Sequence, residues 1–132
     1  MNILLVDDNP LMQQLLVRFL GDLGYNVVAA GRADEALALA DAQAPALFLL
    51  DMYLPDMDGP DALQALRKIP GCAATPAIAM SGLDESAIRP AILSDFVAYL
   101  SKPIDLDLLE TTVAQHLGPQ NARSVGRPLS AE

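Results

Sequence analysis

The chain has 132 residues, which is the length of one ordinary domain and leaves no room for a second. Hydrophobic residues make up 52% of it, which is enough to fill one core. Its formal net charge of −9 argues against binding to the phosphate backbone of nucleic acids. No apolar stretch reaches the roughly 18 residues of a membrane span, and Met1 precedes an apolar run without the charged region of a secretory signal. These features predict one cytoplasmic domain that contacts neither nucleic acid nor membrane directly.

Short apolar runs alternate along the chain with segments of helical periodicity, which is typical of β-α-β units around a parallel sheet. The runs are continuously apolar, as expected for strands that helices cover on both faces. This pattern predicts an α/β fold of five strand-helix pairs. We expect the strands at residues 3–6, 27–30, 47–50, 77–80 and 96–100.

The first helix is predicted to follow Asn9, a favourable N-cap, with Pro10 at its first position and Gly24 after its end. Its buried stripe is predicted to consist of Met12, Leu15, Phe19, Leu20 and Leu23.

Three further helices are predicted at 33–44, after Gly59-Pro60, and from Asp105 to about Leu117. The segment 84–93 is a weaker candidate for the fourth helix, because Pro90 falls inside it. Residues 118–132 are small, polar and aperiodic, and we expect a disordered tail after a domain that spans 1–117. The inward positions are predicted to be Ala36, Leu37, Ala40, Ala62, Leu63, Leu66, Leu106, Leu109, Val113 and Leu117.

Acidic side chains and one lysine stand where predicted strands end. Asp7 and Asp8 follow the first strand, Asp51 follows the third, and Lys102 follows the fifth. Open α/β sheets place their chemistry in the crevice at the carboxyl ends of the strands, so these side chains are expected to meet there. Ser81, at the end of the fourth strand, is expected to add a hydroxyl group to the crevice.

Neighbouring carboxylates repel one another, so at neutral pH they favour a hard divalent cation. Mg²⁺ suits this site because it prefers oxygen ligands and keeps several waters, and Mn²⁺ could substitute. Asp51 could then attack phosphorus as a carboxylate nucleophile and form an aspartyl phosphate, whose charge Lys102 would neutralise. The residues therefore predict a phosphoryl-accepting switch.

Together, these residues and their order resemble the receiver domain of two-component response regulators. The resemblance covers about residues 1–117 and rests on segments in the family's order. These segments are Leu4 to Pro10, Leu50 to Gly59, Ser81-Gly82, Tyr99 and Lys102-Pro103.

The resemblance implies a flavodoxin-like doubly wound (βα)5 fold with the strand order 2-1-3-4-5. It implies Asp51 as phosphoacceptor, Asp7 and Asp8 as the acidic pair at the metal, and the backbone carbonyl of Tyr53 as a further metal ligand. Lys102 and Ser81 would hold the phosphoryl group, and Ser81 and Tyr99 would move in the switch. The face formed by helix 4, strand 5 and helix 5 would report the change, and the bond before Pro103 is usually cis in this family.

The implied partners are a sensor histidine kinase or a histidine phosphotransfer protein and a downstream protein target, with dimerisation on phosphorylation as a further expectation. Such a protein catalyses its own phosphorylation and dephosphorylation and is not a turnover enzyme. We expect a stand-alone receiver, because the residues after Leu117 are too few for an output domain. A receiver-like interaction module that works without phosphorylation is the alternative that the sequence leaves open.

Two departures from the family pattern concern the output face. Asp95-Phe96 stands where receivers commonly carry Gly-Ala, which predicts a different turn into the fifth strand, and Pro90 lies in the helix 4 segment. Asp56 and Asp58 are expected to be solvated loop and cap residues.

Overall fold

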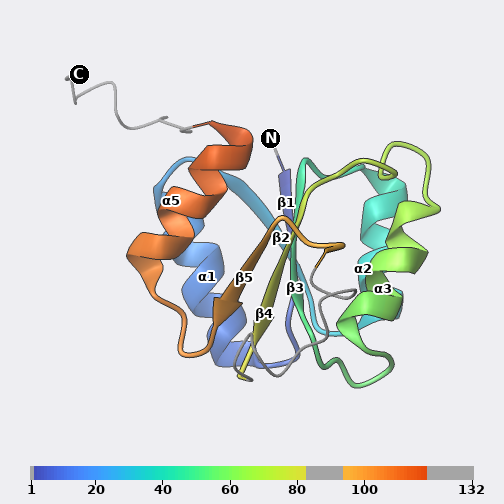
Figure 1. Ribbon diagram of the computed structural model, residues 1–132, viewed down its shortest axis with the longest axis horizontal. Helices are drawn as coiled ribbons and strands as arrows, with labels where there is room; N and C mark the ends of the chain where they lie inside the picture. The colour runs from blue at the N-terminus through green and yellow to red at the C-terminus, as the bar shows by residue number, and fades with distance from the viewer. Residues whose placement is uncertain (1, 83–93, 119–132) are drawn as a thin grey trace.

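A five-stranded parallel sheet forms the centre of the computed structural model, which describes residues 2–82 and 94–118 (Figure 1). The strand order is β2-β1-β3-β4-β5, which confirms the predicted flavodoxin-like arrangement. The strands are β1 (Asn2–Val6), β2 (Asn26–Ala30), β3 (Leu47–Asp51), β4 (Ala77–Ser81) and β5 (Ala98–Ser101).

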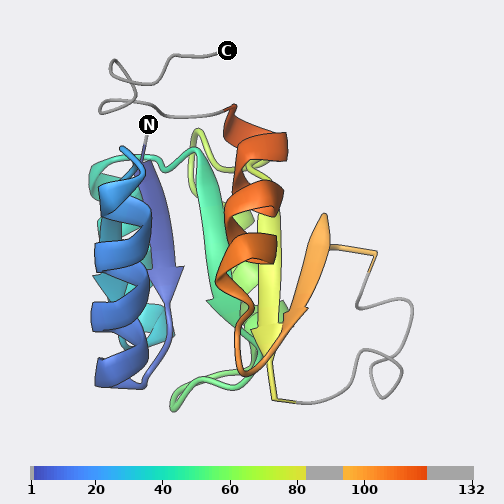
Figure 2. The ribbon, with the colours of Figure 1, turned by 90° about the vertical axis from the view of Figure 1, so that its left-hand side faces the viewer.

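Helices cover both faces of this sheet. Helix α1 (Pro10–Asp22) and helix α5 (Leu106–Leu117) lie on one face, and α2 (Ala33–Ala42) and α3 (Gly59–Arg67) lie on the other (Figures 1 and 2). No helix in the described part of the chain is long and apolar enough to cross a membrane.

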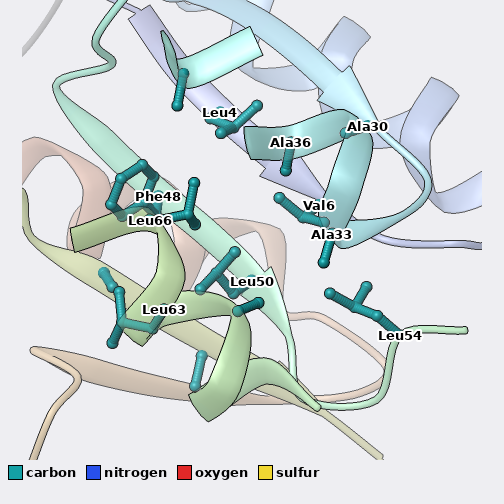
Figure 3. Packing of buried hydrophobic residues seen from close by; sticks show 14 of the residues in the cluster. Leu4, Val6, Ala30, Ala33, Ala36, Phe48, Leu50, Leu54, Leu63 and Leu66 are labelled. Carbon is teal, nitrogen blue, oxygen red and sulfur yellow. The ribbon is translucent and has the colours of Figure 1, made fainter. Parts of the chain in front are cut away.

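The alternation of side chains along each strand divides the core into two clusters. In β1, Ile3 and Leu5 join the cluster beneath α1 and α5, whereas Leu4 and Val6 join the cluster beneath α2 and α3. Figure 3 shows the second cluster, in which Phe48 and other strand residues face apolar side chains of α2 and α3. Burial on both sides explains why the strands are continuously apolar.

Helix α1 begins as predicted, and four of the five residues of its predicted buried stripe pack in the core. The Asn9 side chain accepts hydrogen bonds from the backbone N–H groups of Leu11 and Met12, and Gly24 follows the helix with a φ of 101°. The prediction that Leu15 lies inward is wrong, because its side chain is 47% exposed and Leu16 is fully buried. Leu16 takes the inward position next to Met12, Phe19, Leu20 and Leu23, which pack in the cluster beneath α1 and α5 as predicted.

The start of β5 differs from its prediction, because the strand begins at Ala98 and not at Phe96. Asp95 and Phe96 lie in a turn, and the Phe96 side chain is buried in the α2 and α3 cluster. The apolar side chain of Phe96 therefore contributes to the core, although the residue lies before the strand. The predicted fourth helix at 84–93 and residues 119–132 of the predicted tail lie outside the described residues.

Candidate functional site

The ends of four neighbouring strands bring the predicted site residues to one edge of the sheet. Asp51 and Ser81 are the last residues of β3 and β4, Asp7 follows β1 and Lys102 follows β5. The strands are parallel and in register, with Val6 opposite Leu50 and Asp51 opposite Met80. This edge is the position at which open α/β sheets carry their functional sites.

Three carboxylates converge at this edge. Asp7, Asp8 and Asp51 each offer an oxygen atom, and these atoms lie within 4.8 Å of one another. Asp7 is fully buried, Asp51 is 6% exposed and Asp8 is exposed, so the cluster is shielded from solvent at Asp7 and Asp51 and open to it at Asp8. A set of carboxylate oxygens with one solvent-facing member suits a cation such as Mg²⁺, which retains several waters.

Lys102 lies between two of these carboxylates. Its Nζ atom donates to Oδ2 of Asp7 over 2.9 Å and to Oδ2 of Asp51 over 3.1 Å. The peptide bond from Lys102 to Pro103 is cis, in agreement with the sequence-based expectation. The lysine is separated from Asp7 by 95 residues in sequence, so only the folded sheet brings them together.

The electrostatics of the site follow from burial and these contacts. Burial raises the pKa of Asp51 above its ordinary value, and the nearby Asp7 adds to the rise, while the Tyr53 N–H and Lys102 act against it. Burial alone would lower the pKa of Lys102, but its hydrogen bonds to Asp7 and Asp51 outweigh that effect and raise it. Lys102 is therefore held charged beside a carboxylate that is costly to ionise, and a bound cation would lower that cost.

Comparison with known proteins identifies the family. The sequence model of the response regulator receiver domain matches residues 3–114. The chain belongs to this family.

Two relatives and one solved structure illustrate the similarity. The receiver is 34% identical over 123 residues to the polar-differentiation response regulator DivK of Brucella anthropi, covering 89% of this chain and 96% of the relative. It is 36% identical over 107 residues to the positive alginate biosynthesis regulatory protein of Pseudomonas aeruginosa, where the match covers 79% of this chain and 42% of that longer protein.

The solved structure is the receiver domain of the sensor histidine kinase PA1611 from Pseudomonas aeruginosa, described with a magnesium ion coordinated in its active-site cleft. It has a TM-score of 0.76 and 29% identity, over 89% of this chain and 97% of the other.

The loop after β1 is shaped by two residues to which the sequence analysis assigned no role at the site. The Asn9 N–H donates to Oδ1 of Asp7 over 2.9 Å, and Nε2 of Gln13 donates to the backbone carbonyl of Asp7 over 2.6 Å. Gln13 reaches back across the loop from α1, so it holds the backbone of the acidic pair. A polar residue just inside a helix carries no sequence signal for this contact.

The remaining predicted residues take up positions around the carboxylates. The Tyr53 N–H donates to Oδ1 of Asp51 over 3.2 Å, which places the Tyr53 backbone beside the phosphoacceptor candidate. Ser81 is fully buried, and its carbonyl accepts from the Lys102 N–H over 2.7 Å. Tyr99 is half-buried in β5 and packs against the α2 and α3 cluster, on one side of the sheet.

Asp56 lies in the loop between β3 and α3 as predicted, but the expectation that its side chain is solvated is wrong. Its side chain is only 16% exposed and accepts hydrogen bonds from the backbone N–H groups of Ala33 and Asp34. These donors lie in the first turn of α2, more than twenty residues earlier in the sequence, so local sequence patterns could not reveal them. Asp58 is exposed at the N-cap of α3, as expected, but its side chain makes no capping hydrogen bond.

Proposed function

We propose that the chain accepts a phosphoryl group on Asp51 from a histidine kinase or a histidine phosphotransfer protein, in a reaction that depends on Mg²⁺. The observation that carries the proposal is the ammonium group of Lys102, bound to both Asp51 and Asp7 within the acidic cluster. A lysine held at 3.1 Å from a buried carboxylate is well placed to neutralise charge added to that carboxylate. Membership of the receiver family supports the same function.

In the proposed transfer, an oxygen atom of Asp51 attacks the phosphorus atom of a phosphohistidine. A P–O bond forms as the P–N bond breaks, and the imidazole nitrogen keeps the electron pair and takes up a proton. Lys102 and the hydroxyl group of Ser81 would receive the oxygens of the transferred phosphoryl group. A bound Mg²⁺ would supply positive charge to the attacking and transferred oxygens.

Asp51 must be ionised to act as a nucleophile. Burial and the neighbouring Asp7 raise its pKa, and this rise favours the protonated form. Asp7, Asp8, Asp51 and the backbone carbonyl of Tyr53 are the residues that would hold the metal. Metal binding would favour ionised Asp51, so metal and phosphoryl donor are expected to act together.

We further propose that the protein is a phosphoacceptor that catalyses its own phosphorylation and dephosphorylation, and not an enzyme that turns over a small substrate. Ser81 and Tyr99 would couple the phosphoryl group to the face that β5 and α5 form with the predicted fourth helix, where a downstream protein or a second copy would bind. The cytoplasm remains the proposed location, because the proposed phosphoryl donors act there.

The decisive experiment is intact mass spectrometry after incubation with acetyl phosphate, with and without MgCl₂. The wild type is expected to gain one phosphoryl group, about 80 daltons, only when the metal is present. Asp51→Asn should gain none. Asp61→Asn is a matched control, because Asp61 is an exposed aspartate in the first turn of α3, and it should be labelled like the wild type.

A gain of mass in Asp51→Asn would assign the chemistry to another residue and contradict the proposal. No adduct in a folded wild-type protein that binds Mg²⁺ would favour the interaction module that works without phosphorylation.

A further inference from the structure

The N-terminus of α2 lacks a cap from its own sequence. Arg32 occupies the N-cap position with extended backbone, φ −145° and ψ 158°, and its side chain makes no capping hydrogen bond. The first N–H groups of a helix have no partner within the helix, so they need acceptors from elsewhere.

Asp56 supplies both acceptors from the loop between β3 and α3. Its Oδ1 accepts from the Ala33 N–H over 2.9 Å, and its Oδ2 accepts from the Asp34 N–H over 3.0 Å. The Ala33 N–H is the main cause of a pKa for Asp56 below its ordinary value, which is the behaviour of a carboxylate bound in its charged form. The loop is therefore bonded to α2 by a charge-assisted, bidentate contact.

The same loop is closed at its base. The Gly59 N–H donates to the Met52 carbonyl over 2.7 Å, and Tyr53 pairs with Asp58 in an isolated antiparallel bridge. Gly59 permits this approach, because a Cβ atom there would lie 2.8 Å from the Asp51 carbonyl oxygen.

Between base and tip, Leu54 is buried in the cluster that also contains Ala33, and Figure 3 shows the two side chains on the same side of that cluster. Tyr53 belongs to the closed base through its bridge with Asp58, and the contact at Asp56 holds the loop three residues further along. The Tyr53 backbone is therefore restrained from both directions.

We propose that Asp56 is a positioning residue for the metal site, because its contact with α2 holds the β3–α3 loop so that the Tyr53 carbonyl is in place beside Asp51. This inference rests on the proposed function, in which that carbonyl is a metal ligand. A ligand that is already ordered loses less conformational freedom on binding, so the tether increases metal affinity without touching the metal.

The test is calorimetric titration of the full chain with MgCl₂. Asp56→Ala is expected to weaken Mg²⁺ binding by about tenfold, the lower end of the range for residues that support metal ligands. Asp58→Ala is the matched control for charge, because Asp58 is exposed in the same loop and makes no capping hydrogen bond. It should weaken binding far less.

A second variant separates the tether from the cap. Arg32→Asn combined with Asp56→Ala gives α2 a cap residue of its own and keeps the net charge of the wild type. It should recover thermal stability relative to Asp56→Ala but retain the weakened Mg²⁺ binding. At saturating MgCl₂, labelling of Asp56→Ala by acetyl phosphate should return to the wild-type rate.

Equal Mg²⁺ affinity of Asp56→Ala and Asp58→Ala, or recovery of affinity in the double variant, would overturn the positioning role and leave the proposed function intact. A wild type that binds no Mg²⁺ would overturn both. The two failures are therefore distinguishable.

Discussion

The acidic site has one half at the end of β1 and the other at the end of β3, and the loops that follow these two strands are held in different ways. In the first, Asn9 and Gln13, two and six residues away in sequence, donate to Asp7 and hold the loop that follows it, while Asp7 itself also contacts Ala30 and Lys102. In the second, Asp56 bonds to residues 22 and 23 positions away, at the start of α2. The loop after β1 is thus held by residues near it in sequence, and the loop after β3 depends on contact with a separate β-α unit.

The comparison teaches where sensitivity to mutation should lie. The loop after β1 should keep its shape as long as its own few residues are unchanged, because its hydrogen bonds join residues that are close in sequence. The β3–α3 loop needs its base, its buried Leu54 and its contact with α2 at the same time. We expect the largest effects in this second loop.

The largest effect is expected for Gly59→Ala. An added Cβ atom would lie 2.8 Å from both the Asp51 carbonyl oxygen and the Met52 Cα atom, and these backbone atoms cannot move aside cheaply. We expect the free energy of unfolding to fall by about 3 kcal/mol, at the upper end of the usual range for overpacking. Urea unfolding would measure the change.

Gly21→Ala is the matched control. Gly21 lies in the last turn of α1 with nothing within 4 Å of an added Cβ atom, so alanine should raise the free energy of unfolding by about 0.5 kcal/mol, the lower end of the range for helix interiors. If both variants unfolded at the same urea concentration, the close approach at Gly59 could not be what fixes the base of the loop.

A smaller effect is expected in the local half of the site, for Asn9→Ala. The variant removes the side-chain oxygen that accepts from the N–H groups of Leu11 and Met12. It should reduce the free energy of unfolding by about 1 kcal/mol, as measured by urea unfolding. Asn9→Ser retains a capping oxygen and should recover most of the loss, whereas a serine as destabilising as alanine would show that the cap contributes little.

The same contrast explains which parts of the molecule could be predicted from the sequence. The five strands, the cap at Asn9 and the end of α1 near Gly24 depend on periodicity and neighbouring residues, and their positions were predicted to within two residues. The meeting of Asp7, Asp51 and Lys102 was also predictable, because parallel strands that alternate with helices must end at the same edge.

Contacts between separate units could not be predicted. The residues near Asp56 in sequence do not indicate that its carboxylate caps α2. The need for such a cap arises at Arg32, whose side chain does not cap the helix. Phe96 likewise looked like a strand residue because it is apolar, although its side chain is buried from a turn. In both cases tertiary packing decided the role of a residue whose local pattern suggested another.

The smallest effect tests the charge on Asp56. Hydrogen bonds from the Ala33 and Asp34 N–H groups and the nearby Arg32 hold the pKa of Asp56 below its ordinary value of 3.8. A lowered pKa means that the unfolded chain binds more protons, so the stabilising contribution is complete above 3.8 and is lost as pH falls through the folded-state pKa. Asp56→Asn does not titrate there, so the stability difference between wild type and variant should shrink on acidification.

Urea midpoints of both proteins between about pH 7 and about pH 3 would measure this difference, because their other carboxyl groups titrate alike and cancel. A difference that stayed constant with pH would mean that α2 gains nothing from the charge of Asp56, and the long-range contact would then be held by geometry alone.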